Sequence, residues 1–450
     1  MFSLFIFFLK LNSFLFQIII PFSTIKDNIT TDRSTTFMFC YFPNKIETKI
    51  KIGTPYQEIS LRIKTLLSPI SINSVQMGTI NIIRFNETNS SSYISLSDTP
   101  TYFGENDFIN AIKSKDTINF NNKLILNNIT FLLGIKENLY RSEAGILGLN
   151  IPEFDRRIQE IGFIKQLKQR DLIQKNTYYI KYNETNEDGD LIIGSLPHEI
   201  DSKKYDEKKY DEFNAEIVSS TMGLKVTESY YGETLMDCEF KVELAIEDNF
   251  IRGSEEIKNI LYKIFFEEKI TRNICQSSIF SYIDNENKYF YYCSKKLNLS
   301  EFKNITLYID GSDLKIELSY KDLFYEYKNN YYFMMYFDTK PYSHFFRLGK
   351  ILFKKYILVF NHDNKKIGYY RKENKIKDTK EENKKGNNKF FNQGLIQWII
   401  IGILVFIVGV LSFILIYYKP WKNRTKRANE LQDDDYCYQG INSDGKLNIN

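Results

Sequence analysis

Short apolar or alternating runs, separated by Asn, Asp, Gly and Ser, fill the chain between residues 40 and 372. Runs of this length and spacing are typical of strands, so the pattern predicts a mostly β body. Helical patterns are few, and the clearest lie at 154–169 and 255–268. The strand candidates are residues 46–52, 59–63, 124–133, 177–182, 191–193, 305–309 and 351–360.

A long apolar segment follows this body at residues 395–418, which carry no charged side chain. A helix of this length can cross about 30 Å of hydrocarbon, so the segment predicts one membrane-spanning helix. A cluster of Lys and Arg directly after it predicts that the tail, 419–450, is cytosolic. The polar, lysine-rich stretch at 373–393 has no apolar period and is expected to form a stalk.

The N-terminal residues 1–23 are also mostly apolar and resemble a secretory signal peptide, with an uncleaved anchor as the alternative. Together the two ends predict a single-pass type I membrane protein of the secretory pathway or cell surface, whose large part is luminal or extracellular. Glycosylation sequons fit that route, and they lie at Asn28, Asn86, Asn89, Asn128, Asn183, Asn298 and Asn304.

The cysteines agree with a secretory route, because four of the five precede the predicted membrane helix, where disulfides persist. Cys275 and Cys293, eighteen positions apart, are predicted to be bonded to each other. The sequence leaves the partners of Cys40 and Cys238 open, and Cys437 in the tail is expected to stay reduced.

Charge and motif content exclude several classes of function. Sixty basic and fifty-six acidic residues nearly balance, which is not typical of a nucleic-acid binder. Phosphate-binding loops, zinc-protease motifs and metal spacing among the cysteines are absent from the sequence, so we expect no metal and no cofactor.

Four sequence segments together carry a family resemblance. They are KIGTPYQEISLRIKTLLS at 51–68, AGILGL at 144–149, GDLIIGS at 189–195 and the block at 346–371, FRLGKILFKKYILVFNHDNKKIGYYR. Their order and spacing resemble those of the pepsin-like aspartic peptidases over roughly 320 residues (371 minus 51).

The resemblance implies a mostly β, bilobal fold with a substrate cleft between the lobes. We place the N-terminal lobe at 40–215 and the C-terminal lobe at 216–372. In this family a hydrophobic-hydrophobic-Gly segment crosses under each catalytic turn. Gly148 and Gly349 occupy those places here.

The chemistry of the family needs two aspartates, one from each lobe, each followed by Thr or Ser and then Gly. They share a proton and hold the attacking water, because like charges about 3 Å apart cannot both be ionised. In this chain the first position falls on Lys64, which is followed by Thr65 and Leu66. Neither the acid nor the glycine is retained.

The second catalytic position, counted back from the following glycine, falls on Leu244. Glu243 lies beside it, and a shift of the alignment would reach Glu247 or Asp248. An ammonium at the floor of a cleft is costly without a carboxylate partner. We therefore expect Lys64 to meet Glu243, with Glu247 and Asp248 as the next candidates.

The flap that covers the family's cleft also departs from its usual pattern, although Tyr102 or Phe103 could still serve there. Asp98 precedes Thr99 but lies in a polar stretch, so we interpret it as a loop. Asp310 and Gly311 separate two predicted strands and are expected to form a hairpin turn.

The leading interpretation is a membrane-anchored, pepsin-like protein that lacks the catalytic aspartates and binds a peptide or protein ligand. One alternative is an active aspartic endopeptidase whose active site is atypical or misaligned. A second is a structural surface glycoprotein, which would be favoured if Lys64 and its neighbours fill the cleft.

Overall fold

The computed structural model describes the body of the chain in fourteen segments. They are residues 17–26, 44–66, 69–77, 83–97, 101–103, 109–120, 124–137, 144–150, 161–183, 188–218, 221–281, 287–327, 329–338 and 345–371. Contacts divide the chain into two units, Met1–Glu373 and Asn374–Asn450, and all of the described residues belong to the first.

Several predictions concern residues outside the described part. These are the stalk, the membrane helix at 395–418, the cytosolic tail, Asn28 and Cys40. Within the described part, no helix is long and apolar enough to cross a membrane.

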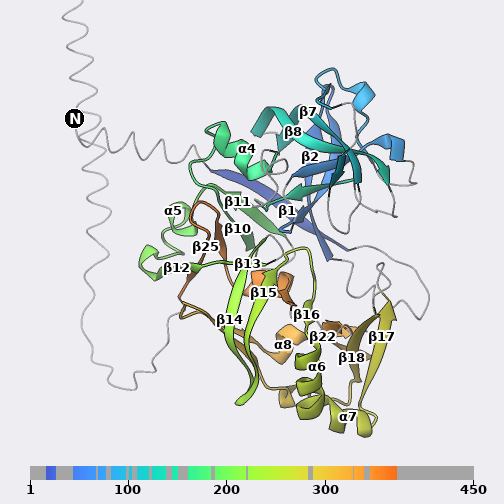
Figure 1. Cartoon of the computed structure of the whole chain (residues 1–450), viewed down its shortest axis with the longest axis vertical. Helices are drawn as coiled ribbons and strands as arrows, with labels where there is room; N and C mark the ends of the chain where they lie inside the picture. Colours follow the sequence, from blue (N-terminus) through green and yellow to red (C-terminus); the bar gives the residue numbers. More distant parts are fainter. Residues whose placement is uncertain are drawn as a thin grey trace, which may run out of the picture. The chain divides into compact units, whose positions relative to one another are not determined.

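The first of two sheets is built mainly from the N-terminal half of the chain (Figure 1). Its strand order is β12-β25-β24-β10-β11-β1-β2-β3-β9-β4-β8-β7-β5, and β6 pairs with β7 off this path. The bounds are β1 Ile18–Lys26, β2 Asn44–Ile52, β3 Gln57–Lys64, β4 Ile70–Asn73, β5 Ile94–Ser95, β6 Thr101–Phe103, β7 Ile109–Phe120, β8 Leu124–Glu137, β9 Gly145–Gly148, β10 Thr177–Tyr182, β11 Gly189–Ile193, β12 Tyr210–Asn214, β24 Val359–Asn361 and β25 Lys366–Tyr370.

The second sheet has the order β17-β18-β22-β16-β23-β15-β14-β19-β20, with β13 beside β14 and β21 beside β22. The bounds are β13 Glu216–Val218, β14 Thr221–Tyr231, β15 Thr234–Leu244, β16 Ile251–Gly253, β17 Cys275–Ser281, β18 Asn287–Ser294, β19 Ile305–Ile309, β20 Lys315–Leu318, β21 Phe324–Tyr327, β22 Asn330–Asp338 and β23 Phe345–Leu348.

The change from one sheet to the other falls between β12 and β13, but the chain does not stay in the second sheet. Strands β24 and β25 return to the first sheet, where β24 pairs with β10 and β25 pairs with β12. The first sheet is therefore completed only by the last described strands.

The helices are short, with bounds α4 Phe163–Gln169, α5 Pro197–Ile200, α6 Glu255–Leu261, α7 Glu267–Thr271, α8 Tyr320–Leu323 and α9 Lys350–Lys355. The helix predicted at 255–268 is confirmed. Ser254 caps its start by accepting from Ile257 N, and a π-helical turn, Tyr262–Phe266, joins α6 to α7. Of the helix predicted at 154–169, residues 154–160 lie outside the described segments, residues 161 and 162 are not helical, and α4 covers the rest.

One predicted strand is wrong. Residues 351–360 form most of α9 and only the beginning of β24. The run is apolar at nearly every position apart from two lysines, so it has neither a helical nor a strand period. Its first half belongs to helix α9, which begins directly after Gly349 and has Leu352 and Phe353 buried.

The remaining strand candidates are confirmed, and their alternation explains the core. In β3, Ile59, Leu61 and Ile63 are at most 2% exposed, while the residues between them are half-buried. The predicted disulfide is also present. Cys275 and Cys293 face each other across β17 and β18, with their Cα atoms 3.9 Å apart.

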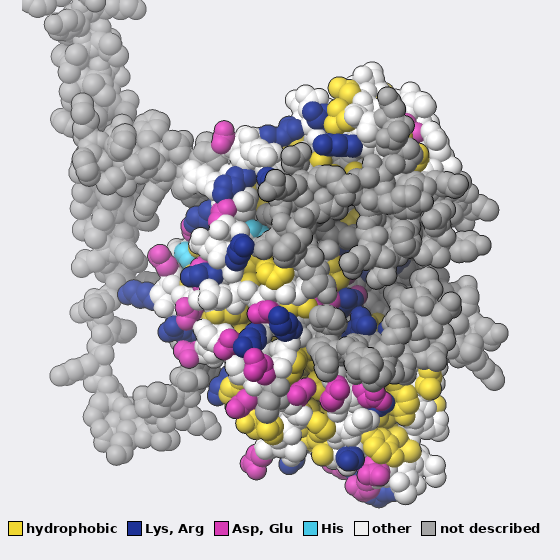
Figure 2. Space-filling model, viewed as in Figure 1, with side chains coloured by type: hydrophobic (Ala, Val, Ile, Leu, Met, Phe, Trp, Pro, Cys, Tyr) yellow, Lys and Arg dark blue, Asp and Glu magenta, His cyan; other side chains and the backbone are white. Residues whose placement is uncertain are grey.

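The described residues are mostly β, as predicted. On the face drawn in Figure 2, their basic and acidic side chains lie intermixed, in keeping with the near balance of charges in the sequence.

Candidate functional site

Each sheet contains one strand that ends beside a glycine segment running parallel to it. Strand β3 pairs with β9, and its last residue, Lys64, lies opposite Gly148. Strand β15 pairs with β23, and Leu244 lies opposite Leu348. The next residue, Ala245, donates its N–H to the carbonyl oxygen of Leu348 at 3.0 Å, and Gly349 follows Leu348.

Thr65 joins the two strand ends and identifies the second position. This buried side chain places its hydroxyl 3.0 Å from the carbonyl oxygen of Leu244 and accepts from the N–H of Ile246 at 3.1 Å. Its two main-chain partners therefore stand on either side of Ala245.

The glycine register and the Thr65 bridge agree that the residue equivalent to Lys64 is Ala245, not Leu244. The predicted position was one residue too early. Counting back from Gly253 assumed a spacing of nine residues, whereas Ala245 precedes Gly253 by eight (253 minus 245).

A second connection between the sheets is made by Glu247, which follows Ala245 by two residues. Its half-buried carboxylate accepts from the N–H of Thr65 at 3.0 Å, from the N–H of Leu66 at 3.3 Å and from the Thr65 hydroxyl at 2.9 Å. Its main-chain oxygen accepts from Arg62 at 3.1 Å. We call this set of contacts the Glu247 clasp.

The sequence signal for the clasp was weak. Thr65 is the one residue of the family's Asp-Thr-Gly triplet that this chain retains at the first position. Glu247 stands where the second triplet would have its glycine, and no pattern in the sequence indicated that a carboxylate there would bind backbone N–H groups.

Arg347 of β23 holds the other two nearby acids. Its guanidinium lies 2.5 Å from the Glu243 carboxylate and 3.0 Å from the Asp248 carboxylate, and Glu243 is buried. The predicted pairing of Lys64 with Glu243 is wrong, because Glu243 lies directly opposite Arg347 in the parallel strand register. Glu247 and Asp248 likewise have other partners, and Lys64 itself is half-buried.

Burial and charge act against each other in this ion cluster. Burial raises the pKa of Glu243, and the nearby Asp248 and Glu247 add to that effect, while Arg347 opposes it. Burial alone would lower the pKa of Arg347, but attraction to Asp248 and Glu243 outweighs it and holds that pKa above its ordinary value. The guanidinium therefore stays charged and lies between the two acids.

The other predicted site residues are less informative. Tyr102 and Phe103 belong to β6, which pairs with β7, but their side chains lie outside what the structure describes. Asp98 and Thr99 also fall outside. The predicted hairpin turn is confirmed, since Gly311 has a φ of +64° between the antiparallel strands β19 and β20.

The six sequons within the described segments lie at accessible positions, with Asn86 half-buried and the others exposed. Asn86 and Asn298 cap short 3-10 helices, since their side-chain oxygens accept from Thr88 and Ser300. Glycosylation itself stays a prediction. No group of His, Cys, Asp and Glu in the described segments is arranged to hold a metal ion.

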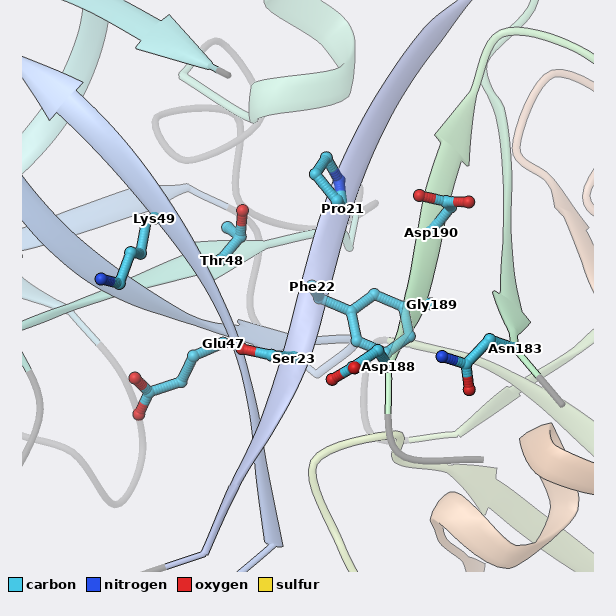
Figure 3. Close-up of a pocket in the computed structure, with 10 residues that line it drawn as sticks. All are labelled: Pro21, Phe22, Ser23, Glu47, Thr48, Lys49, Asn183, Asp188, Gly189 and Asp190. Atoms are coloured by element: carbon cyan, nitrogen blue, oxygen red, sulfur yellow. The ribbon is translucent and has the colours of Figure 1, made fainter. Parts of the chain in front are cut away.

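Figure 3 shows the residues that line a shallow hollow of about 470 Å³. They come from β1, β2, the turn between β10 and β11, and the start of β11, and include Pro21, Glu47, Asn183 and Asp190. Neither Lys64 nor Ala245 contributes to it, so we do not assign it to the family's cleft.

Comparisons with known proteins support the resemblance seen in the sequence. A family model described as eukaryotic aspartyl protease matches residues 46–371. A search of curated proteins gives no match.

Proposed function

Because the chain belongs to the eukaryotic aspartyl protease family, we propose that it is a proteolytically inactive, membrane-anchored member that binds a peptide or protein ligand. The observation that carries this proposal is the pair Lys64 and Ala245 at the two positions that the glycine register and the Thr65 bridge identify. One is a cation and the other a methyl group.

This pair cannot perform the family's reaction. Aspartic peptidases need one carboxylate to take a proton from water while its protonated partner donates one to the substrate carbonyl. An ammonium group has no acceptor for the proton of water, and alanine has no titratable group. Both chemical roles are therefore missing.

The acids close to these positions are already engaged. Glu243 and Asp248 both bind Arg347, and the carboxylate of Glu247 accepts from Thr65 and Leu66. The single Arg347 guanidinium forms an ion pair with each of these two carboxylates. This arrangement supports a structural role for these acids.

A retained binding surface is supported by what the chain keeps. Thr65 still bridges the two strand ends, Gly148 still lies opposite Lys64, and Gly349 still follows the residue paired with Leu244, although the acids are gone. Keeping these contacts without the acids suits a protein that holds a polypeptide without cutting it. The membrane anchor rests on the apolar segment at 395–418.

The test uses the full-length chain purified in detergent and incubated with a mixed peptide library at acid pH. We expect no cleavage products beyond those of a heat-denatured control, no effect of a transition-state inhibitor, and recovery of a subset of library peptides with the protein. Cleavage that the inhibitor blocks would overturn the proposal, and peptide recovery equal to the denatured control would favour a structural glycoprotein.

A second candidate function is an active peptidase with an atypical acid pair, and the raised pKa of buried Glu243 favours it. A raised pKa extends the pH range over which a carboxyl can donate a proton as a general acid. If Glu243 acts with Asp248, the wild-type chain cleaves peptides and Glu243→Gln abolishes cleavage. An unchanged, low background in both proteins would exclude this candidate.

A further inference from the structure

Strand β1, Ile18–Lys26, overlaps the end of the apolar N-terminal stretch, residues 1–23, that resembles a signal peptide. Its first half pairs with β11, from Ile18 opposite Ile193 to Phe22 opposite Gly189. Its second half pairs with β2, where Ser23 begins the pairing. The strand therefore forms part of the continuous order of the first sheet and connects two of its other strands.

The side chains of β1 follow the two-residue period of a half-buried strand. Ile18, Ile20 and Phe22 are 5%, 0% and 4% exposed and belong to the main hydrophobic core. Ile19, between them, is 44% exposed, and Pro21 is also exposed. A membrane-targeting segment needs apolar character but no such alternation, whereas a sheet strand does.

Strand β1 packs closely against β11 at Gly189. The Phe22 ring rests on Gly189, where an added Cβ would come within 2.7 Å of the ring and 2.2 Å of the Lys181 carbonyl oxygen. Figure 3 shows Phe22 turned from β1 toward Gly189 of β11. The ring of Tyr182 lies edge-on against Phe22, with centroids 5.3 Å apart.

A contact from the far end of the described chain also reaches β1. Lys350, a buried residue at the start of α9, places its ammonium 3.0 Å from the Thr24 hydroxyl. Strand β1, which has nine residues, is therefore contacted by its neighbours in the first sheet, by Gly189 and by α9.

We propose that the secretory leader is removed by a cut upstream of Ile18, so that β1 remains in the mature protein as a permanent strand. The reaction is ordinary peptide-bond hydrolysis by a signal-peptidase-type endopeptidase. Water gives its hydroxyl to the leader's new carboxyl end and a proton to the new amino end. A cut after Ser23 would instead remove the three buried side chains and leave β11 without this partner.

The direct test is the N-terminus of the mature protein. The full-length chain with a C-terminal tag is produced in a eukaryotic secretory host, extracted in detergent, and analysed by N-terminal sequencing and peptide mass spectrometry. We expect a start at or before Ile18 and after Met1. A start at Ser23 or later, or retention of Met1, overturns the proposal.

A matched pair of variants tests the same inference through stability. Ile20→Ala removes a buried side chain and Ile19→Ala an exposed one, while both make the same chemical change in the apolar stretch. We expect Ile20→Ala to lower the melting midpoint by about 3 to 8 °C and Ile19→Ala to leave it nearly unchanged. Equal melting midpoints for the two mature proteins would show that the strand is not part of the fold, whichever way the peptidase assay turns out.

Discussion

Replacing Glu247 by glutamine tests whether the clasp holds the two sheets together. The substitution keeps the length and shape of the side chain but removes its charge and turns one acceptor oxygen into an NH2 donor. One carboxylate oxygen now accepts from the N–H and hydroxyl of Thr65 and the other from the N–H of Leu66, so the new donor would face one of these two sets. At least one of these contacts must be lost.

The size of the effect follows from the three contacts to the carboxylate. A hydrogen bond to a charged group contributes about 1.5 to 3 kcal/mol when it is well shielded from water. Glu247 is half-buried, so we take about 1 kcal/mol for each contact after solvent screening. Glutamine keeps one neutral acceptor, and the expected loss of unfolding free energy is about 2 kcal/mol.

The measurement is calorimetry of the full-length chain in detergent at neutral pH. The control is Glu233→Gln, which makes the same chemical change at an exposed position between β14 and β15. We expect Glu247→Gln to lower the melting midpoint by about 2 to 5 °C and Glu233→Gln to shift it by less than about 1 °C. Equal shifts in the two variants would mean that the clasp contributes nothing to the folded state.

Three further predictions concern acid pH, the disulfide and the replaced acids. Burial lowers the pKa of His362 to about 4, so the free energy of unfolding should fall by up to about 3 kcal/mol as pH drops from about 6.5 to about 4. Melting curves recorded against pH should show a shallower fall for His362→Gln. Replacing Cys275 and Cys293 together by serine should cost about 3 kcal/mol, measured by urea unfolding, and the loss should vanish when both proteins are compared under reducing conditions. Lys64→Asp, alone or with Ala245→Asp, should give no inhibitor-sensitive cleavage in the peptide assay, because Leu66 and Glu247 still stand where the family's two triplets have glycine. Measurable turnover in either variant would contradict this expectation.

Much of the β body could be predicted from the sequence because its strands alternate. The run containing Ile59, Leu61 and Ile63 has one buried face, which fixes both the element and its inward side chains. The run at 351–360 failed for the opposite reason, since it is apolar on all sides and its period is undefined. Strand β1 was not predicted, because an apolar N-terminal stretch is also typical of a leader peptide.

The candidate site was predictable only at its first position. There, the match to the family pattern is continuous through Lys64, and the pairing of Lys64 with Gly148 agrees with that alignment. The second position moved by one residue because the spacing to Gly253 is not that of the family. The pairing of Glu243 with Arg347 depends on the register of two strands about a hundred residues apart in sequence (347 minus 243), which no local pattern specifies.

The return of β24 and β25 to the first sheet has a consequence for biosynthesis. Strand β10 ends at Tyr182, but its partner β24 begins only at Val359. At about 5 to 20 residues per second, the ribosome needs on the order of 10 to 35 seconds to supply the missing partner. Until then β10 and β12 each lack a partner strand, and such edges invite pairing with other chains. The first sheet cannot be completed before β24 and β25 have been synthesised, and we expect the N-terminal half of the chain to depend on chaperones until then.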